Sequence, residues 1–202
     1  SKNFETNLNG TLSISNTGYN KLYQTNINEK ILINNLIYES MDSINTLGLI
    51  NNFEIQIKNF NSDSKNSAEY KNKTENNIQG LFQFNSSYPL KKDGNKYDSS
   101  LTPIFNLKIN PQPNKNIKNF SSLVDYTNIY SINRIGSNDT LEGGESITIG
   151  NEFKILNKQN DDEIFGFNLA TSFRKDKNED LSIMSSLGQK TSNIVGEMNL
   201  KT

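Results

Sequence analysis

The chain has 202 residues, enough for one domain or for part of a larger one. Only 33% of the residues are hydrophobic, there is no tryptophan, and asparagine occurs 35 times. The formal net charge of -1 argues against an electrostatic nucleic-acid binder, and the absence of cysteine and histidine excludes thiol and histidine chemistry. We therefore predict no cofactor, no metal and no nucleic-acid partner.

Hydrophobic and polar residues alternate along most of the chain, and this period of two predicts β-strands. Residues 31–38 are apolar enough for a helix, but their paired asparagines and β-branched residues favour a strand. Residues 157–162 are a polar turn of the Asn/Asp type. In chain order, we expect strands at 8–15, 21–27, 30–40, around 53–57, 78–90, 101–109, 147–155 and 165–173, then around 181–187 and 194–200.

The spacing of these strands favours a membrane barrel over a soluble sandwich. There is no run of 18 apolar residues, so no transmembrane helix is expected, but a transmembrane strand needs only about 9–11 residues with alternate ones facing lipid. The later strands recur at roughly 15–20 residues, longer than the ~8–12 of sandwiches. We predict an all-β fold, an antiparallel transmembrane β-barrel segment of about ten meandering strands from a larger outer-membrane barrel. Apolar faces would meet lipid, and Asn, Ser, Thr, Gln and Lys would line the lumen.

The most specific segment is DYTNIYSINRIGSNDTLEGGESITIGNEFKIL, residues 125–156. It holds Arg134, one of only two arginines, with Asp139 and Glu142 close behind. A catalytic or metal site would need two acids held at a fixed separation, which this spacing does not provide. We favour a structured loop, in which Arg134 binds Asp139 or Glu142 and the pair Gly143-Gly144 permits a tight return into the next strand. We therefore predict no catalytic residue and no enzyme.

This segment resembles the barrel of the LPS-assembly family LptD, also called organic solvent tolerance protein. The glycine at Gly136 departs from the family pattern by lying closer to the arginine. Three more segments are similar to the family in the same order: residues 23–40, residues 57–65, and the pair 88–90 and 101–111. Together they cover about residues 25–200. The matching residues of the first segment are Asn128, Ile129, Tyr130, Ser131, Arg134, Asp139, Glu142, Gly143, Gly144 and Gly150.

The resemblance implies that residues 1–202 are a single partial domain, the middle strands of an LptD-like barrel, without its jellyroll and closing strands. It implies transport of lipopolysaccharide to the outer leaflet of a Gram-negative outer membrane. The partners implied are lipopolysaccharide, an LptE-like lipoprotein plug, the periplasmic Lpt bridge acting through the jellyroll, and outer-membrane lipid. A lesser possibility is that the loop around Arg134 contacts phosphate or sugar of passing lipopolysaccharide. Another outer-membrane porin-like channel and a soluble all-β surface adhesin remain as alternatives.

Overall fold

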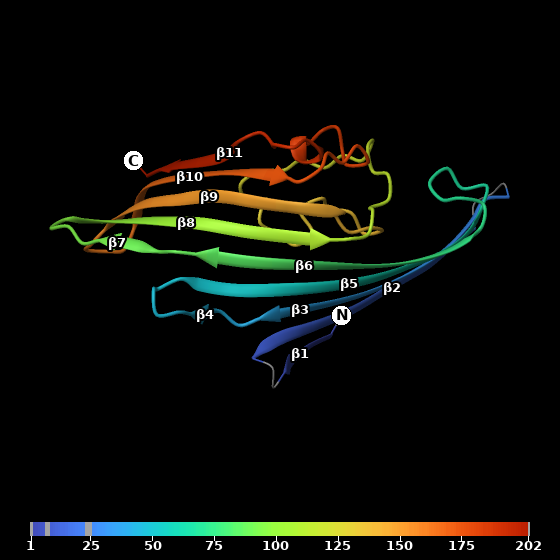
Figure 1. Ribbon diagram of the computed structural model, residues 1–202, viewed down its shortest axis with the longest axis horizontal. Helices are drawn as coiled ribbons and strands as arrows, with labels where there is room; N and C mark the ends of the chain where they lie inside the picture. Colours follow the sequence, from blue (N-terminus) through green and yellow to red (C-terminus); the bar gives the residue numbers. More distant parts are fainter. Residues whose placement is uncertain (1, 7–8, 23–25, 202) are drawn as a thin grey trace.

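The computed structural model describes residues 2–6, 9–22 and 26–201, which form one antiparallel sheet (Figure 1). No helix among these described residues is long and apolar enough to cross a membrane. The strands are β1 (Lys2–Thr6), β2 (Gly10–Leu22), β3 (Asn28–Ser40), β4 (Ser43–Ile44), β5 (Ile50–Lys65), β6 (Thr74–Ser87), β7 (Leu90–Lys92), β8 (Tyr97–Asn110), β9 (Gly144–Asn157), β10 (Glu163–Arg174) and β11 (Val195–Leu200), with a short 3₁₀ turn η1 (Ser186–Gly188).

The strands meander: each long strand pairs with the next long strand of the chain, in the order β1-β2-β3-β5-β6-β8-β9-β10-β11. The short strands β4 and β7 pair with β5 and β8 at their ends. Residues 31–38 lie within β3 and pair on both sides, which confirms the strand prediction for them. The all-β, antiparallel, meandering fold predicted from the sequence is confirmed.

The two ends of the sheet carry different connections. At one end lie 41–49, 88–96 and the turn 158–162. At the other end lie 66–73 and two much longer segments, 111–143 and 175–194. We call these the short-turn end and the long-connection end. Strands β2, β3, β5 and β6 project past the end of β8 on the long-connection side (Figure 1).

Burial in the sheet is the reverse of that in a soluble protein. Side chains on one face alternate with those on the other, and the polar face is the buried one. Ile57 and Ile149 are each 46% exposed, whereas Lys108 is 2% exposed. Because this apolar face is exposed and not covered by other described residues, a lipid phase is the environment that suits it. The buried polar residues of β5, β6, β8 and β9 include Gln56, Lys58, Gln79, Gln83, Asn106, Lys108, Ser146 and Thr148.

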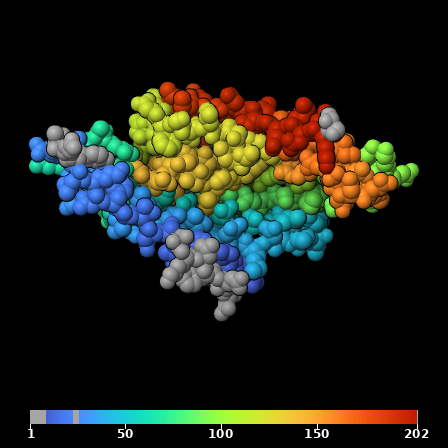
Figure 2. All heavy atoms as spheres, turned by 180° about the vertical axis from the view of Figure 1, so that it is seen from behind, coloured from blue at the N-terminus to red at the C-terminus, as the bar shows by residue number. Residues whose placement is uncertain are grey.

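The polar face is buried because the chain covers it with residues 111–143, which we call the inward segment. Figure 2, seen from behind, shows these residues lying over the sheet beside residues 175–194. One small apolar cluster joins the inward segment to residues 175–194, and another joins it to the sheet. Ile117 and Ile135 pack with Leu181 and Leu187. The other cluster packs Ile129 and Tyr126 against Ala170 of β10.

Two strand predictions need correction. The strands expected at 8–15 and 21–27 are one strand, β2, because residues 10–22 pair without interruption against β3; residues 8 and 23–25 lie outside the described part of the chain. Residues 181–187 are not a strand. Their alternating Leu181 and Leu187 turn toward Ile117 and Ile135 instead of adding to the sheet, and β11 takes the place beside β10.

Candidate functional site

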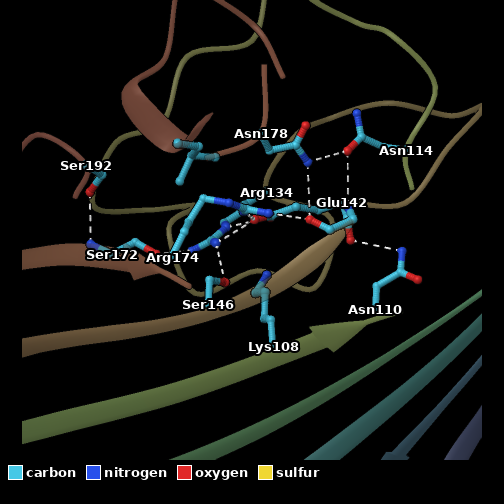
Figure 3. Close-up of polar contacts among 12 residues, drawn as sticks. Lys108, Asn110, Asn114, Arg134, Glu142, Ser146, Ser172, Arg174, Asn178 and Ser192 are labelled. Atoms are coloured by element: carbon cyan, nitrogen blue, oxygen red, sulfur yellow. Dashed lines mark hydrogen bonds and ion pairs between the residues drawn. The ribbon is translucent and has the colours of Figure 1, made fainter. Parts of the chain in front are cut away.

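Arg134 lies at the centre of a buried polar cluster between the inward segment and the sheet (Figure 3). It donates two parallel hydrogen bonds to Glu142, from Nε to Oε2 and from Nη2 to Oε1, each 2.7 Å. The Arg134 side chain is 0% exposed and that of Glu142 3%. Fork-like pairing of this kind is the strongest geometry available to an arginine and a carboxylate. The pair fixes the two arms of the inward segment against each other.

The same guanidinium also binds the sheet. Arg134 donates to Ser146 (2.8 Å) and Thr148 (2.9 Å) of β9, and to Ser172 (3.1 Å) of β10. Together with Glu142 and the Ile129 carbonyl, these acceptors engage all five N–H groups of Arg134. No donor remains for a phosphate or sugar, so the geometry favours an anchor for the inward segment over a ligand contact.

Arg174, at the end of β10, is the second arginine of the cluster. It donates to the Glu142 carboxylate and to the Gly143 carbonyl. Lys108 of β8 reaches the inward segment as well, donating to the Ser131 carbonyl. Sequence analysis did not select Arg174 or Lys108. The rarity of arginine in this chain is a signal that could have selected Arg174. The alternation of β8 could have selected Lys108, because it places a charged residue on the inward face.

The ionisation of Glu142 sets a pH limit on the cluster. Burial alone raises the pKa of its carboxyl, but the attraction of Arg134, reinforced by Lys108 and Arg174, outweighs burial and lowers the pKa to about 2 from the ordinary 4.5. A carboxyl with a depressed folded-state pKa stabilises the fold above its unfolded pKa, and that stability is lost as the pH falls toward the folded value.

We therefore expect the inward segment to stay docked from pH 8 to pH 5 and to loosen between pH 4.5 and about 2. Limited proteolysis with pepsin, sampled below pH 4.5, would detect new cleavages within residues 111–143, and hydrogen exchange would cover the range above it. Loosening that begins near pH 6 would contradict the assignment to Glu142.

Three glycines of the motif sit where a side chain would collide with a neighbouring group. A Cβ on Gly143 would lie 2.8 Å from the backbone of Gln112. Gly144 has φ +91, a left-handed conformation that favours glycine, and lies against Arg174. A Cβ on Gly150 of β9 would lie 2.0 Å from Tyr130 Oη. Gly143 and Gly144 thus form the turn into β9, and Gly150 makes room for an aromatic residue of the inward segment.

Asp139 is not part of the arginine cluster. It accepts hydrogen bonds from Tyr70 Oη (3.0 Å) and from Lys115 Nζ (3.2 Å) near the β5–β6 connection. Burial, with the neighbouring Tyr19 and Asp139, raises the pKa of the Tyr70 phenol, which therefore stays a donor to Asp139. Of the two acids that sequence analysis offered to Arg134, the structure brings only Glu142 to it. Asp139 fastens the inward segment at a second point.

Strands β5 and β6 bind the inward segment through further inward side chains. Lys58 donates to the Ser137 carbonyl (3.3 Å). Gln79 donates to the Pro113 carbonyl (2.7 Å) and accepts from Leu141 N (2.8 Å). With the contacts made by β8, β9 and β10, five successive long strands hold the inward segment by polar side chains. It is therefore a built layer of the fold, docked on the sheet at several points.

A sheet that turns apolar side chains outward, and buries polar ones beneath a segment of its own chain, defines the wall of a membrane β-barrel with an occupied interior. Comparison with protein-family models matches LptD, LPS transport system D, over residues 7–202. The chain belongs to the LptD family. This family is an outer-membrane β-barrel, and its function is the transport and assembly of lipopolysaccharide at the outer membrane. A search of curated proteins finds no match.

Proposed function

We propose that this chain is a stretch of barrel wall in the outer membrane of a Gram-negative bacterium, past which lipopolysaccharide moves to the outer leaflet. The observation that carries the proposal is the reversed burial of the sheet in a chain of the LptD family. Its apolar face suits lipid, and its polar face offers hydrogen bonds to sugars and phosphates wherever the inward segment leaves it open.

We further propose that residues 1–202 are one partial domain that continues into other strands of the barrel. In support, the sheet of the described residues is open: β1 pairs only with β2, and β11 only with β10. In hydrocarbon every backbone N–H and C=O must find a partner, which an antiparallel sheet achieves by closing. A lipoprotein of the LptE kind inside the barrel, and a periplasmic Lpt bridge reaching it through a jellyroll, complete the proposed assembly.

The motif residues Arg134, Asp139, Glu142, Gly143, Gly144 and Gly150 are proposed to be structural, fixing the inward segment to the wall. The contacts of Glu142 support this role, since its carboxylate accepts from both Arg134 and Arg174. A carboxylate with a pKa of about 2 is a poor proton acceptor at neutral pH. We propose that the chain has no catalytic activity.

Depletion of the full-length protein tests the transport proposal. Lipopolysaccharide exposed on intact cells, labelled with a reagent that cannot cross the outer membrane, is expected to fall while total lipopolysaccharide is retained. Restoring the wild-type gene should restore labelling. An unrelated outer-membrane protein, measured in parallel, controls for a general loss of the membrane. Unchanged surface labelling after depletion would overturn the proposal.

A further inference from the structure

The outward apolar surface narrows toward the N-terminal strands. On β8 the outward apolar positions run from Leu101 to Ile109, about 26 Å at roughly 3.3 Å per residue. On β5 they run only from Phe53 to Ile57, about 13 Å by the same rise. Beyond Ile57, toward the long-connection end, the outward face of β5 becomes polar. The apolar band is therefore shortest on β5, where it ends at Ile57, while Leu32 of β3 and Ile78 of β6 still face outward beside it.

Past this end of the band, asparagines face outward on β5 and on the strands beside it, and we call them the amide row. They face outward on four neighbouring strands, because each stands in register with, or two residues along from, an outward apolar residue. The row comprises Asn16 of β2, Asn34 of β3, Asn59 and Asn61 of β5, and Asn76 of β6.

The amides of the row bind one another but leave part of their capacity free. Asn59 Oδ1 accepts from Asn34 (3.0 Å) and from Asn61 (2.6 Å), and Asn59 Nδ2 donates to Asn76 (3.2 Å). Within the described part of the chain, the Asn34 and Asn61 carbonyl oxygens and the Asn76 amide nitrogen have no protein partner, and Asn76 is exposed. The row thus presents fixed acceptors and a donor side by side.

We propose that the amide row is a binding site for the sugar headgroup of a glycolipid in the outer leaflet. Sugar hydroxyls both donate and accept hydrogen bonds, which matches a row offering both. The long connections mark the external end of a barrel, so the row lies at the outer-leaflet end of the apolar band. On β5 one amphiphile can lie along the wall, with its acyl chains against Ile55 and Ile57 and its sugars against Asn59 and Asn61.

This inference rests on the proposed function, because it assumes that the wall stands in a membrane whose outer leaflet is glycolipid. It differs from transport through the interior, since the amide row lies on the opposite face from the inward segment. The row would hold lipid against the outside of the wall at the place where the apolar band is shortest.

The test uses the full-length protein in phospholipid nanodiscs, with a dye on a cysteine introduced at the outward Thr74, next to the row. Titration with lipopolysaccharide reports local binding. In the variant Asn34→Val/Asn59→Val/Asn61→Val the half-saturating concentration is expected to rise about tenfold, since each lost hydrogen bond is worth roughly two- to tenfold in affinity. The variant Asn34→Ser/Asn59→Ser/Asn61→Ser keeps a polar surface and guards against impaired folding of the valine variant. Its half-saturating concentration is also expected to rise.

Asn151→Val is the matched control, because Asn151 also faces outward but lies within the apolar band of β9, opposite Pro103. It should leave the titration unchanged. Equal titrations for wild type and both triple variants would overturn the proposal, as would an equal response to lipid stripped of its sugars. A triple variant that loses a co-purifying membrane protein, but still titrates normally, would overturn it in favour of a protein contact. The depletion experiment is independent, so failure of the row and failure of the transport function are distinguishable.

Discussion

Replacing Glu142 with glutamine is expected to release the inward segment from the barrel wall. Among the residues that the structure describes, Glu142 is the only carboxylate bonded to Arg134 and Arg174, and both guanidinium groups are buried. Glutamine fills the same space but leaves those cations without a countercharge, and breaking a buried ion pair costs about 3–5 kcal/mol. Limited proteolysis of the full-length protein in detergent should reveal new cleavage within residues 111–143.

Asp139→Asn is the matched control for this prediction. Asp139 is also an acid of the motif, but its side chain is 18% exposed and its ion pair with Lys115 is partly solvated. Such a pair contributes about 0–1 kcal/mol, so proteolysis should change much less than in Glu142→Gln. Comparable cleavage in Glu142→Gln and Asp139→Asn would mean that the arginine cluster is not the main anchor.

Gly150→Ala should produce the second-largest effect. A Cβ at this position would lie 2.0 Å from Tyr130 Oη and 2.4 Å from the Leu169 carbonyl oxygen. One contact is with the inward segment and the other with the backbone of β10, so the methyl group forces both to move. Overpacking of this kind costs about 1–3 kcal/mol, and a backbone contact is the harder one to relieve. The heat-dependent gel mobility of the folded barrel should be lost at a lower temperature than in the wild type.

Gly80→Ala provides the comparison, because Gly80 lies mid-strand in β6 and a Cβ there meets nothing within 4 Å. Alanine at this site should leave stability unchanged or raise it by about 0.4–1 kcal/mol, through the lower entropy of the unfolded chain. Adding Tyr130→Phe to Gly150→Ala should restore part of the loss, since it removes the nearest of the two contacts. Full restoration would show that the Leu169 contact relaxes without cost.

The strands and their facing were predictable because a period of two is a local property. Ile147, Ile149 and Phe153 alternate with polar residues whatever lies around them, and the structure places them on one face of β9, as expected. The same local pattern misled at Leu181 and Leu187. Those leucines alternate too, but β11 occupies the edge beside β10, so they pack on the inward segment instead.

The partners in the arginine cluster were only half predictable. Pairing of Arg134 with Glu142 and pairing with Asp139 were both open, since either acid is within reach along a loop. The choice depends on strand register: β10 brings Arg174 to Glu142 across 32 positions of sequence, while the β5–β6 connection brings Tyr70 to Asp139 across 69. Such distances cannot be read from spacing in one sequence, because register is set by the whole sheet.

The place of Arg174 in the chain gives the cluster a role in the order of assembly. Arg134 and Glu142 lie between β8 and β9 in the chain. Ser172, a partner of Arg134, and Arg174, a partner of Glu142, belong to β10. A nascent sheet that ends at β9 would hold Arg134 and Glu142 with part of their hydrogen-bonding capacity unmet, at a cost that addition of β10 removes. We therefore expect the last turn of the inward segment to gain its full set of contacts only after β10 has paired, which would link closure of the interior to completion of the wall around it.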